Sequence, residues 1–234
     1  MPKKSKSELV EIYKDTLSYA KETIDSPPES FKSKINDKEI EELCVNSSKL
    51  YEKTNIWVEN NDVIESIINL NEVSPSTPEN KMLVLNLASH KCFGGGARSG
   101  AMAQEEELFR KTDYGIHYGK ELYPLEKDEF VVTPRVTLIK DTNYKRLEKK
   151  DFVRFDGFAI AGVCHPTLVD GHLNKEDYEL TKHKIETIFK FAIFNGNKNL
   201  VLGALGCGVF FNPPEDIVEI YNYCLKKYYG YFEN

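Results

Sequence analysis

Three glycines and a run of acidic residues lie close together near the middle of the sequence. Gly94–Gly96 are followed, after seven residues, by Gln104–Glu107. Backbone N–H groups in a glycine loop can approach a ligand closely. Two adjacent carboxylates beside an apolar surface repel each other and lose hydration, so one of them should keep its proton to unusually high pH. A protonated glutamate beside a phosphate-binding loop can serve as a general acid.

The helix that must position these carboxylates is expected from about residue 100 to residue 112. Side chains on a helix advance by about 100° per residue, which separates the glutamates around its axis. Glu105 then points toward the core, and Glu107 lies one turn before Lys111 and faces solvent. Glu106 falls between the two. A solvated, charged helix face is the ordinary alternative for such a run.

A second glycine loop, GALGCGVFFNPPED, follows the strand-like segment NLVL. In α/β folds ligands bind beyond the carboxyl ends of the strands. Both glycine loops lie at such ends, where each could bind a phosphate. We expect Asn212 to cap the helix that starts after it, with Glu215 at the capping-box position. Neither loop matches the Walker A pattern, which argues against a nucleotide triphosphatase.

The rest of the chain reads as alternating strands and helices. We expect helices at 5–24, 38–51, 62–70, 100–112, 175–195 and 213–227, and strands at 54–62, 82–89, 130–139, 155–163 and 199–205. In the first of these strands Ile56 and Val58 alternate with polar residues, and Asn60 or Asn61 can cap the helix that follows. The alternation of apolar strands with helices favours an α/β sandwich with a buried, largely parallel sheet.

Composition narrows the class of protein. The chain has 234 residues, 41% of them hydrophobic, and can bury one sizeable core, so we expect one principal domain. A net charge of -6 argues against direct binding of duplex nucleic acid through a basic face. No apolar run reaches the roughly 20 residues needed to cross a bilayer, and the N-terminus lacks the apolar stretch of a signal peptide. We expect a soluble intracellular protein without membrane contacts, in the cytoplasm or the nucleus.

The cysteines form no C-x-x-C pair, and their odd number suits free thiols better than disulfides. They are Cys44, Cys92, Cys164, Cys207 and Cys224. His90 with Cys92, and Cys164 with His165, come nearest to a metal cluster, but their spacing supports ordinary packing rather than zinc. Cys207 with His165 could also suggest a cysteine hydrolase, although a small buried thiol between two glycines is the simpler interpretation.

Beyond these readings of single residues, the combined motifs resemble a known family. Three glycines, seven residues and then Gln-Glu-Glu match the pattern of poly(ADP-ribose) glycohydrolases, which have a macrodomain-type fold. The string NLASHKCFGGGARSGAMAQEEELFRKTDY resembles the compact bacterial-type branch of that family, although Phe93 stands where the branch usually has proline. LGALGCGVFFNPPE is similar to the diphosphate loop of the branch, and KDTLSYAKE loosely resembles its leading helix. The resemblance extends over about residues 82–228.

The resemblance implies a macrodomain-like three-layer sandwich, with a mixed, mostly parallel sheet between helices. It implies an N-terminal helical extension over residues 1–52, which in the branch caps the bound ribose, and a catalytic domain over residues 53–234. Glu106 would be the general acid and base, Glu105 would hold ribose hydroxyls, and Gln104 would brace the pair. The implied substrate-binding residues are Asn86, Gly94, Gly95, Gly96, Gln104, Gly206, Cys207, Gly208, Val209 and Phe210.

The activity implied is hydrolysis of the ribose–ribose O-glycosidic bonds of poly(ADP-ribose), with release of ADP-ribose from chain ends. Cleavage of such a bond passes through an oxocarbenium-like state, which negative charge stabilises, and the substrate's own diphosphate can supply that charge. No metal or other cofactor is required. The expected partners are poly(ADP-ribose) or ADP-ribosylated proteins as substrate and ADP-ribose as product. Two alternatives remain open, a macrodomain that binds ADP-ribose without cleaving it and a hydrolase of single ADP-ribosyl groups.

Overall fold

The structure, a computed structural model, describes residues 4–35, 38–117 and 121–234. The helices are α1 Lys6–Thr23, α2 Lys38–Asn46, α3 Val63–Val73, α4 Gln104–Lys111, α5 Lys175–Phe194 and α6 Pro214–Lys227. The strands are β1 Phe31–Lys34, β2 Lys81–Leu87, β3 Glu129–Leu138, β4 Val153–Ile160, β5 Leu168–Val169, β6 His172–Leu173 and β7 Asn197–Val201. Short 3-10 helices lie at η1 Ala97–Ser99, η2 Asp113–Ile116 and η3 Lys149–Asp151. The side chains of residues 43–46, and so that of Cys44, lie outside the description.

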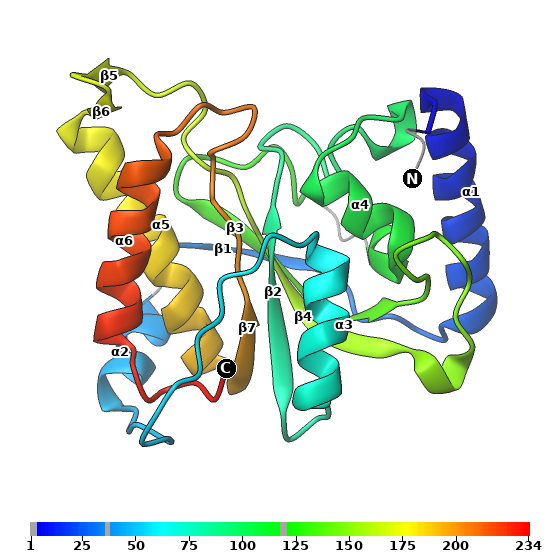
Figure 1. The fold of residues 1–234 in the computed structure, drawn as a ribbon, viewed down its shortest axis with the longest axis horizontal. Helices are drawn as coiled ribbons and strands as arrows, with labels where there is room; N and C mark the ends of the chain where they lie inside the picture. The colour runs from blue at the N-terminus through cyan, green and yellow to red at the C-terminus, as the bar shows by residue number, and fades with distance from the viewer. Residues whose placement is uncertain (1–3, 36–37, 118–120) are drawn as a thin grey trace.

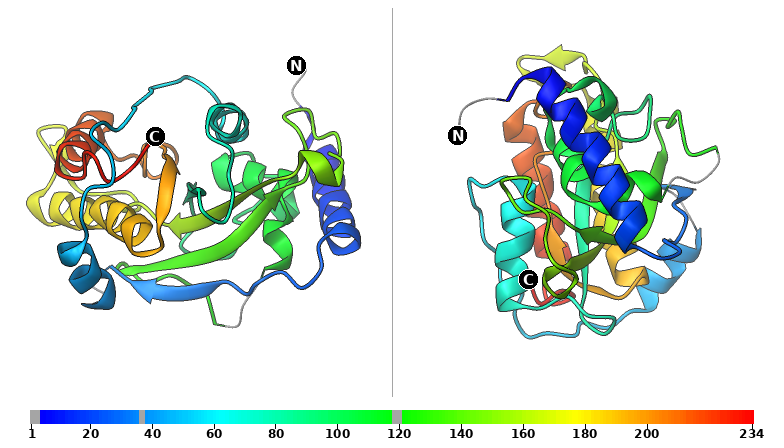
Figure 2. Two further views of the ribbon diagram at one scale, coloured as in Figure 1. Left: turned by 90° about the horizontal axis from the view of Figure 1, so that it is seen from below. Right: turned by 90° about the vertical axis from the view of Figure 1, so that its right-hand side faces the viewer.

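A central five-stranded sheet has the order β1-β3-β4-β2-β7. β2 runs parallel to both of its neighbours, β4 and β7, whereas β3 is antiparallel to β4 and β1 is antiparallel to β3. Helices α2, α5 and α6 cover one face, and α1, α3 and α4 lie on the other (Figure 1; Figure 2). The predicted three-layer α/β sandwich with a mostly parallel sheet is therefore confirmed.

The buried strand β2 shows why two layers of helices are needed. Its side chains point alternately to the two faces of the sheet, as the pleat requires. Leu83 and Leu85 join the apolar cluster under α5 and α6. Met82 and Val84 join the cluster under α3 and α4. With both faces apolar, the strand is stable only when helices cover it on both sides.

The first 52 residues contribute to both the helical layer and the sheet. α1 packs against α4 and η1, and β1 pairs with β3 through four residues. The sequence did not indicate β1. The predicted division between residues 52 and 53 stays a prediction. None of the helices formed by the described residues combines the length and the apolar composition of a membrane span.

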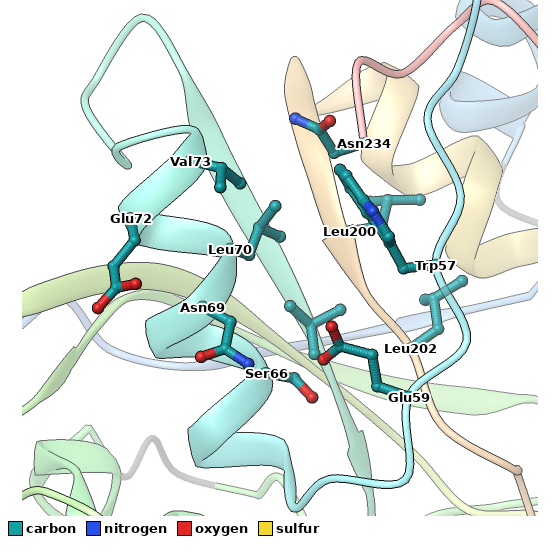
Figure 3. Close-up of a pocket in the computed structure, with 11 residues that line it drawn as sticks. Trp57, Glu59, Ser66, Asn69, Leu70, Glu72, Val73, Leu200, Leu202 and Asn234 are labelled. Carbon is teal, nitrogen blue, oxygen red and sulfur yellow. The ribbon is translucent and has the colours of Figure 1, made fainter.

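The strand predicted at residues 54–62 is wrong. The outer edge of β7 is occupied by the last residues of the chain, with Leu200 N donating to Asn234 O at 3.1 Å and Glu233 N donating to Lys198 O at 2.9 Å. The segment 54–62 runs outside these residues, and Val58 is 98% exposed. Trp57 lies beside Leu200 and Asn234, where it lines a cavity of about 400 Å³ between α3 and β7 (Figure 3).

Two helix starts also differ from the prediction. α4 begins at Gln104 rather than near residue 100, because Gly100 is left-handed, with φ +76°, and Ala103 is extended. A Cβ at Gly100 would come within 2.5 Å of the Lys6 carbonyl oxygen, so this turn lets α1 approach the glycine loop. The cap of α3 is Asp62, not Asn60 or Asn61, and its carboxylate accepts hydrogen bonds from Ile64 N and Glu65 N.

Boundaries shift elsewhere without changing the topology. The second predicted helix, at 38–51, ends at Asn46, and the strand predicted at 199–205 is β7, which ends at Val201. A short β5–β6 hairpin lies before α5 and was not predicted. Asn212 does not cap α6, because its side chain is used elsewhere, and Pro213 holds that position without a side-chain hydrogen bond.

Replacement of the α3 cap tests this corrected boundary. Asp62→Ala should lower the free energy of unfolding by about 1 kcal/mol, because two N–H groups in the first turn of α3 lose their acceptor. Asn60→Ala, two residues earlier, should leave that free energy unchanged within about 0.5 kcal/mol. Urea unfolding followed by circular dichroism measures both. Equal losses for the two variants would contradict the assignment of the cap.

Candidate active site

A cleft of about 710 Å³ opens at the carboxyl ends of β2, β4 and β7. Four segments line it: residues 87–92, 95 and 96 at and after the end of β2, residues 103–106 at the start of α4, residues 162, 164 and 165 after β4, and residues 204–206 and 208–211 after β7. Both predicted glycine loops therefore meet in one place, together with the predicted acidic residues. This is the position at which parallel α/β sheets bind ligands.

Glu105 is buried, with 3% of its surface exposed, and backbone groups hold its carboxylate. Oε2 accepts a hydrogen bond from Ser89 N at 2.7 Å, and Oε1 accepts one from Gly94 N at 3.2 Å. The Asn86 side chain adds a third donor to Oε1, at 3.4 Å. The first α4 turn is thereby tied to the loop that follows β2.

Burial, helped by the negative charge of Glu106, raises the pKa of Glu105 to about 8, although the hydrogen bonds from Ser89, Asn86 and Gly94 oppose the shift. The expectation that one carboxyl of the pair keeps its proton to high pH agrees with this shift. As the general acid that the family resemblance implies, Glu106 would carry that proton, but the raised pKa is that of Glu105. Because the two groups interact, the proton is a property of the pair.

Glu106 is also buried, with 7% of its surface exposed, yet it lines the cleft. Its Oε1 accepts a hydrogen bond from Gly96 N at 2.8 Å. Its Oε2 is buried and has no hydrogen-bond partner among the described residues. A buried carboxyl oxygen without a partner is costly, since its desolvation is not compensated. The atom is therefore poised to bond a group that enters the cleft.

The middle glycine of the first loop brings the two carboxyls together. A Cβ at Gly95 would lie 2.5 Å from Glu106 Oε1 and 2.8 Å from Glu105 Oε2. Both distances are below any normal contact, so only glycine fits here without a shift of the acidic pair. The glycines therefore have two roles: they leave room for the two carboxyl groups, and they leave the backbone N–H groups of the loop accessible to acceptors.

Gln104 fastens the start of α4 to the end of β2. Its Nε2 donates to Leu85 O at 2.6 Å, and its Oε1 accepts from Leu87 N at 2.8 Å. The Gln104 side chain thus bonds the backbone at the end of β2, and these two hydrogen bonds fix the first turn of α4 relative to the sheet. This position of Gln104 is compatible with the predicted role of bracing the acidic pair. Its contact with a substrate stays a prediction.

The far end of α4 is anchored by Glu107, which is less exposed than expected. Its carboxylate forms ion pairs with Arg110 and with Lys111, the predicted neighbour one turn later, both at 3.0 Å. It also accepts a hydrogen bond from the Tyr144 hydroxyl at 2.7 Å. Arg110 is fully buried and also donates to the Ala101 carbonyl oxygen. Glu107 thus supports the helix and does not line the cleft.

The second glycine loop is held against the end of β4. Asn212 Nδ2 donates to Val163 O at 2.7 Å and to Gly206 O at 3.1 Å. The His165 N–H donates to Phe210 O at 3.0 Å. These contacts place Gly206 and Gly208–Phe210 along the cleft.

Three of the predicted residues do not line the cleft. Asn86 and Gly94 lie behind it and act through Glu105. Cys207 is half-buried and packs against the apolar cluster under α5 and α6. Its side chain does not line the cleft, so its predicted role in binding can involve only its backbone.

Other residues of the cleft were not predicted to contact a ligand. They include Ser89, His90, Lys91, Cys92, Gly162, Cys164, His165 and Phe211. In the sequence these residues stand at or just after the ends of the predicted strands 82–89 and 155–163, except Phe211, which belongs to the second glycine loop. His90, Cys92, Cys164 and His165 all line the cleft, but no group of three possible metal ligands occurs in the described part of the chain.

Comparison with known proteins gives consistent results. The family model "Microbial-type PARG, catalytic domain" matches residues 5–141. The poly(ADP-ribose) glycohydrolase (PARG) of Thermomonospora curvata is similar in structure, with a TM-score of 0.79 and 22% sequence identity over 97% of this chain and 91% of that one. The same protein bound to the inhibitor ADP-HPD gives a TM-score of 0.71 at 20% identity, over 92% and 85% of the two chains.

The PARG of Deinococcus radiodurans in complex with ADP-ribose gives a TM-score of 0.71 at 19% identity, over 93% of this chain and 87% of that one. No curated protein sequence matches this chain significantly. At these identities the structural likeness establishes the shared fold, whereas the family model establishes the family. Because that model spans more than half of the 234 residues, the chain belongs to the microbial-type PARG catalytic-domain family, whose members are glycosidases.

Proposed function

We propose that this protein hydrolyses the ribose–ribose bonds of poly(ADP-ribose), with Glu106 as general acid and then general base. The main support is Glu106, which lines the cleft and whose Oε2 atom is buried without a hydrogen-bond partner among the described residues. Glu105 lies next to it and provides a site where a proton remains bound at neutral pH. A glycosidase needs such a proton close to the departing oxygen.

The bond-breaking step follows from this geometry. Glu106 Oε2 donates the shared proton to the departing ribose oxygen as the bond to the anomeric carbon breaks. The electron pair of that bond stays with the departing oxygen, and positive charge develops on the distal ribose. The ionised Glu106 then accepts a proton from water as the water oxygen bonds to the anomeric carbon. The released unit is ADP-ribose, and the proton of the pair is restored.

The two glycine loops would hold the substrate for this step. Gly206 and Gly208–Phe210 line the wall opposite the carboxyl pair, where their backbone would wrap the diphosphate. Phe210, which packs beside His90 with ring centroids 5.9 Å apart, would order the distal ribose. Negative charge on the diphosphate would stabilise the oxocarbenium-like state, so a single acidic glutamate can suffice.

The carboxyl pair favours an enzyme over a module that only binds ADP-ribose. Burial of two adjacent carboxyls costs free energy, because one must stay protonated or repel the other. A binding module gains nothing from that cost. The T. curvata and D. radiodurans proteins were solved with ADP-HPD and with ADP-ribose, which fits the proposed substrate class. Hydrolysis of single ADP-ribosyl groups stays an open alternative, and an intracellular location and the lack of binding to duplex nucleic acid stay predictions.

Glu106→Gln should separate binding from turnover. The amide retains an oxygen for Gly96 N but carries no transferable proton, so turnover of the polymer should fall by about 10²- to 10⁴-fold. Binding of ADP-ribose, measured by calorimetry, should persist. Glu65→Gln, at an exposed position on α3 outside the cleft, is the matched control and should retain activity within a few-fold. Turnover that survives in Glu106→Gln would refute the assigned role, and no turnover by the unaltered protein would favour a binding module.

The pH dependence of activity should reflect the shared proton. The pKa of Glu105 is raised to about 8, so the pair carries its proton below that pH and loses it above. We expect kcat/KM for the polymer to fall as the pH rises through about 8, by about tenfold per unit at higher pH. Initial rates at low substrate concentration measure this limb. A kcat/KM that stays level well above that pH would contradict a protonated pair.

Cleavage at chain ends predicts a simple product profile. Long polymer should yield monomeric ADP-ribose from the earliest times, whereas internal cleavage would yield oligomers first. The described N-terminal residues support the first glycine loop from behind, through the contact of Gly100 with Lys6, and do not line the cleft. Chromatography of products from labelled polymer decides the question, and early oligomers would show that the ends are not required.

A further inference from the structure

A second cavity, of about 380 Å³, adjoins the catalytic cleft on the side of β4 and α5. The two share four residues, His90, Gly162, Cys164 and His165. His90 directly follows Ser89, whose N–H donates to Glu105, so one of the shared residues is next in the chain to a residue that holds the carboxyl pair. A ligand in the catalytic cleft that reaches the four shared residues would enter this cavity.

Lys184 of α5 lines the cavity as a buried cation without a counter-ion. Only 3% of its surface is exposed, and its Nζ donates to Ala161 O at 2.9 Å. It forms no ion pair with any residue in the described part of the chain. Asp128 favours its charge from a distance, but that carboxylate pairs with Lys34 at 3.4 Å. Burial lowers the pKa of Lys184 to about 8.

A second cation stands at the rim of the same cavity. Lys127 is exposed, and its positive charge contributes to the lowered pKa of Lys184, so the two ammonium groups repel each other. Two carboxylates also line the cavity. That of Asp177 already accepts hydrogen bonds from the Asn174 side chain at 2.8 Å and from Thr167 N at 3.3 Å. The other belongs to Glu126, which is exposed to solvent.

An anion between the two lysines would relieve both their repulsion and the uncompensated burial of Lys184. An anion gains the most binding free energy when the cation that it contacts is already desolvated and fixed in place. The proposed reaction offers an anion of this kind. The alcohol that departs is the adenosine ribose of the next ADP-ribose unit, which carries its own diphosphate a few bonds away from the breaking bond.

We propose that the cavity lined by Lys184 and Lys127 binds the diphosphate of the next ADP-ribose unit, the one whose adenosine ribose departs as the alcohol. This inference rests on the proposed function and extends it, because it provides a subsite on the far side of the scissile bond. The enzyme would then favour linkages between two ADP-ribose units over linkages to an uncharged group. Lys184 and Lys127 act here as specificity residues, since neither lies at the carboxyl pair.

Two substrates distinguish this role from a general effect. One is poly(ADP-ribose), and the other is ADP-ribose whose distal ribose carries a 4-nitrophenyl group instead of the next unit. Lys184→Met should lower kcat/KM on the polymer by about tenfold or more, because a charged hydrogen bond to phosphate is lost. It should leave the nitrophenyl substrate within about twofold. Lys127→Ser, at an exposed position, should show a smaller loss with the same selectivity.

Lys226→Ser is the control, because it removes the same charge at an exposed site on α6 outside both cavities. It should change kcat/KM for neither substrate. Equal losses on both substrates would overturn the subsite, as would full polymer activity in Lys184→Met. If this variant does not fold, Lys127→Ser carries the same comparison. Failure of the unaltered protein on both substrates would instead refute the proposed function.

A local measurement tests the subsite without turnover. Inorganic pyrophosphate should slow acetylation of Lys184 by acetic anhydride about fivefold or more at saturation, because a bound anion keeps the amine protonated and covers it. Acetylation of Lys226 in the same samples should not change. Mass spectrometry of peptides measures both rates. Acetylation of Lys184 that is unaffected by pyrophosphate would contradict the inference even in a protein that cleaves the polymer.

Discussion

The central constraint on this structure is the burial of two adjacent carboxyl groups, Glu105 and Glu106, in the first turn of α4. Neither could remain there in an apolar environment without donors. Backbone N–H groups of Ser89, Gly94 and Gly96 supply them. The loop after β2 must therefore follow the helix closely, and a side chain at Gly95 would collide with both carboxyls. The glycine triplet and the acidic run form one unit.

The rest of the fold holds this unit in place. Gln104 binds the end of β2 on one side of the turn, and Arg110 binds Glu107 on the other. Strands β2 and β4 lie parallel, so their following loops meet at one edge of the sheet. Asn212 brings the second glycine loop to the same edge. The result is a cleft lined both by the acidic residues at the start of α4 and by the second glycine loop.

The sequence predicts those regions whose structure depends on residues nearby in the chain. The alternation in β2, the amphipathic helices and the paired glycine loops all follow from local pattern, and so does the meeting of both loops at one edge. The family resemblance then assigns roles that composition cannot. The segment 54–62 shows where this approach fails. Its alternation is strand-like, but the edge it would need is occupied by Glu233 and Asn234, which no local pattern reveals.

Electrostatic details were equally hidden in the sequence. The adjacent glutamates predict a retained proton, but which carboxyl keeps it depends on burial and on donors from the distant residues Ser89 and Asn86. The side chain of Cys207 could not be placed either, because a thiol between two glycines can face a ligand or a core. Likewise, a lysine within the helical pattern of α5 gives no sign that Lys184 forms no ion pair with the residues that the structure describes.

The most direct test of this account is a crystal structure of the protein with bound ADP-ribose. We predict that Glu106 Oε2 lies within about 2.6–3.2 Å of the oxygen on the anomeric carbon of the distal ribose, a hydrogen-bonding distance for proton transfer. The diphosphate should contact the backbone of residues 206–210. A nucleotide bound elsewhere, or a Glu106 carboxyl turned to solvent and far from the ribose, would contradict the central claim.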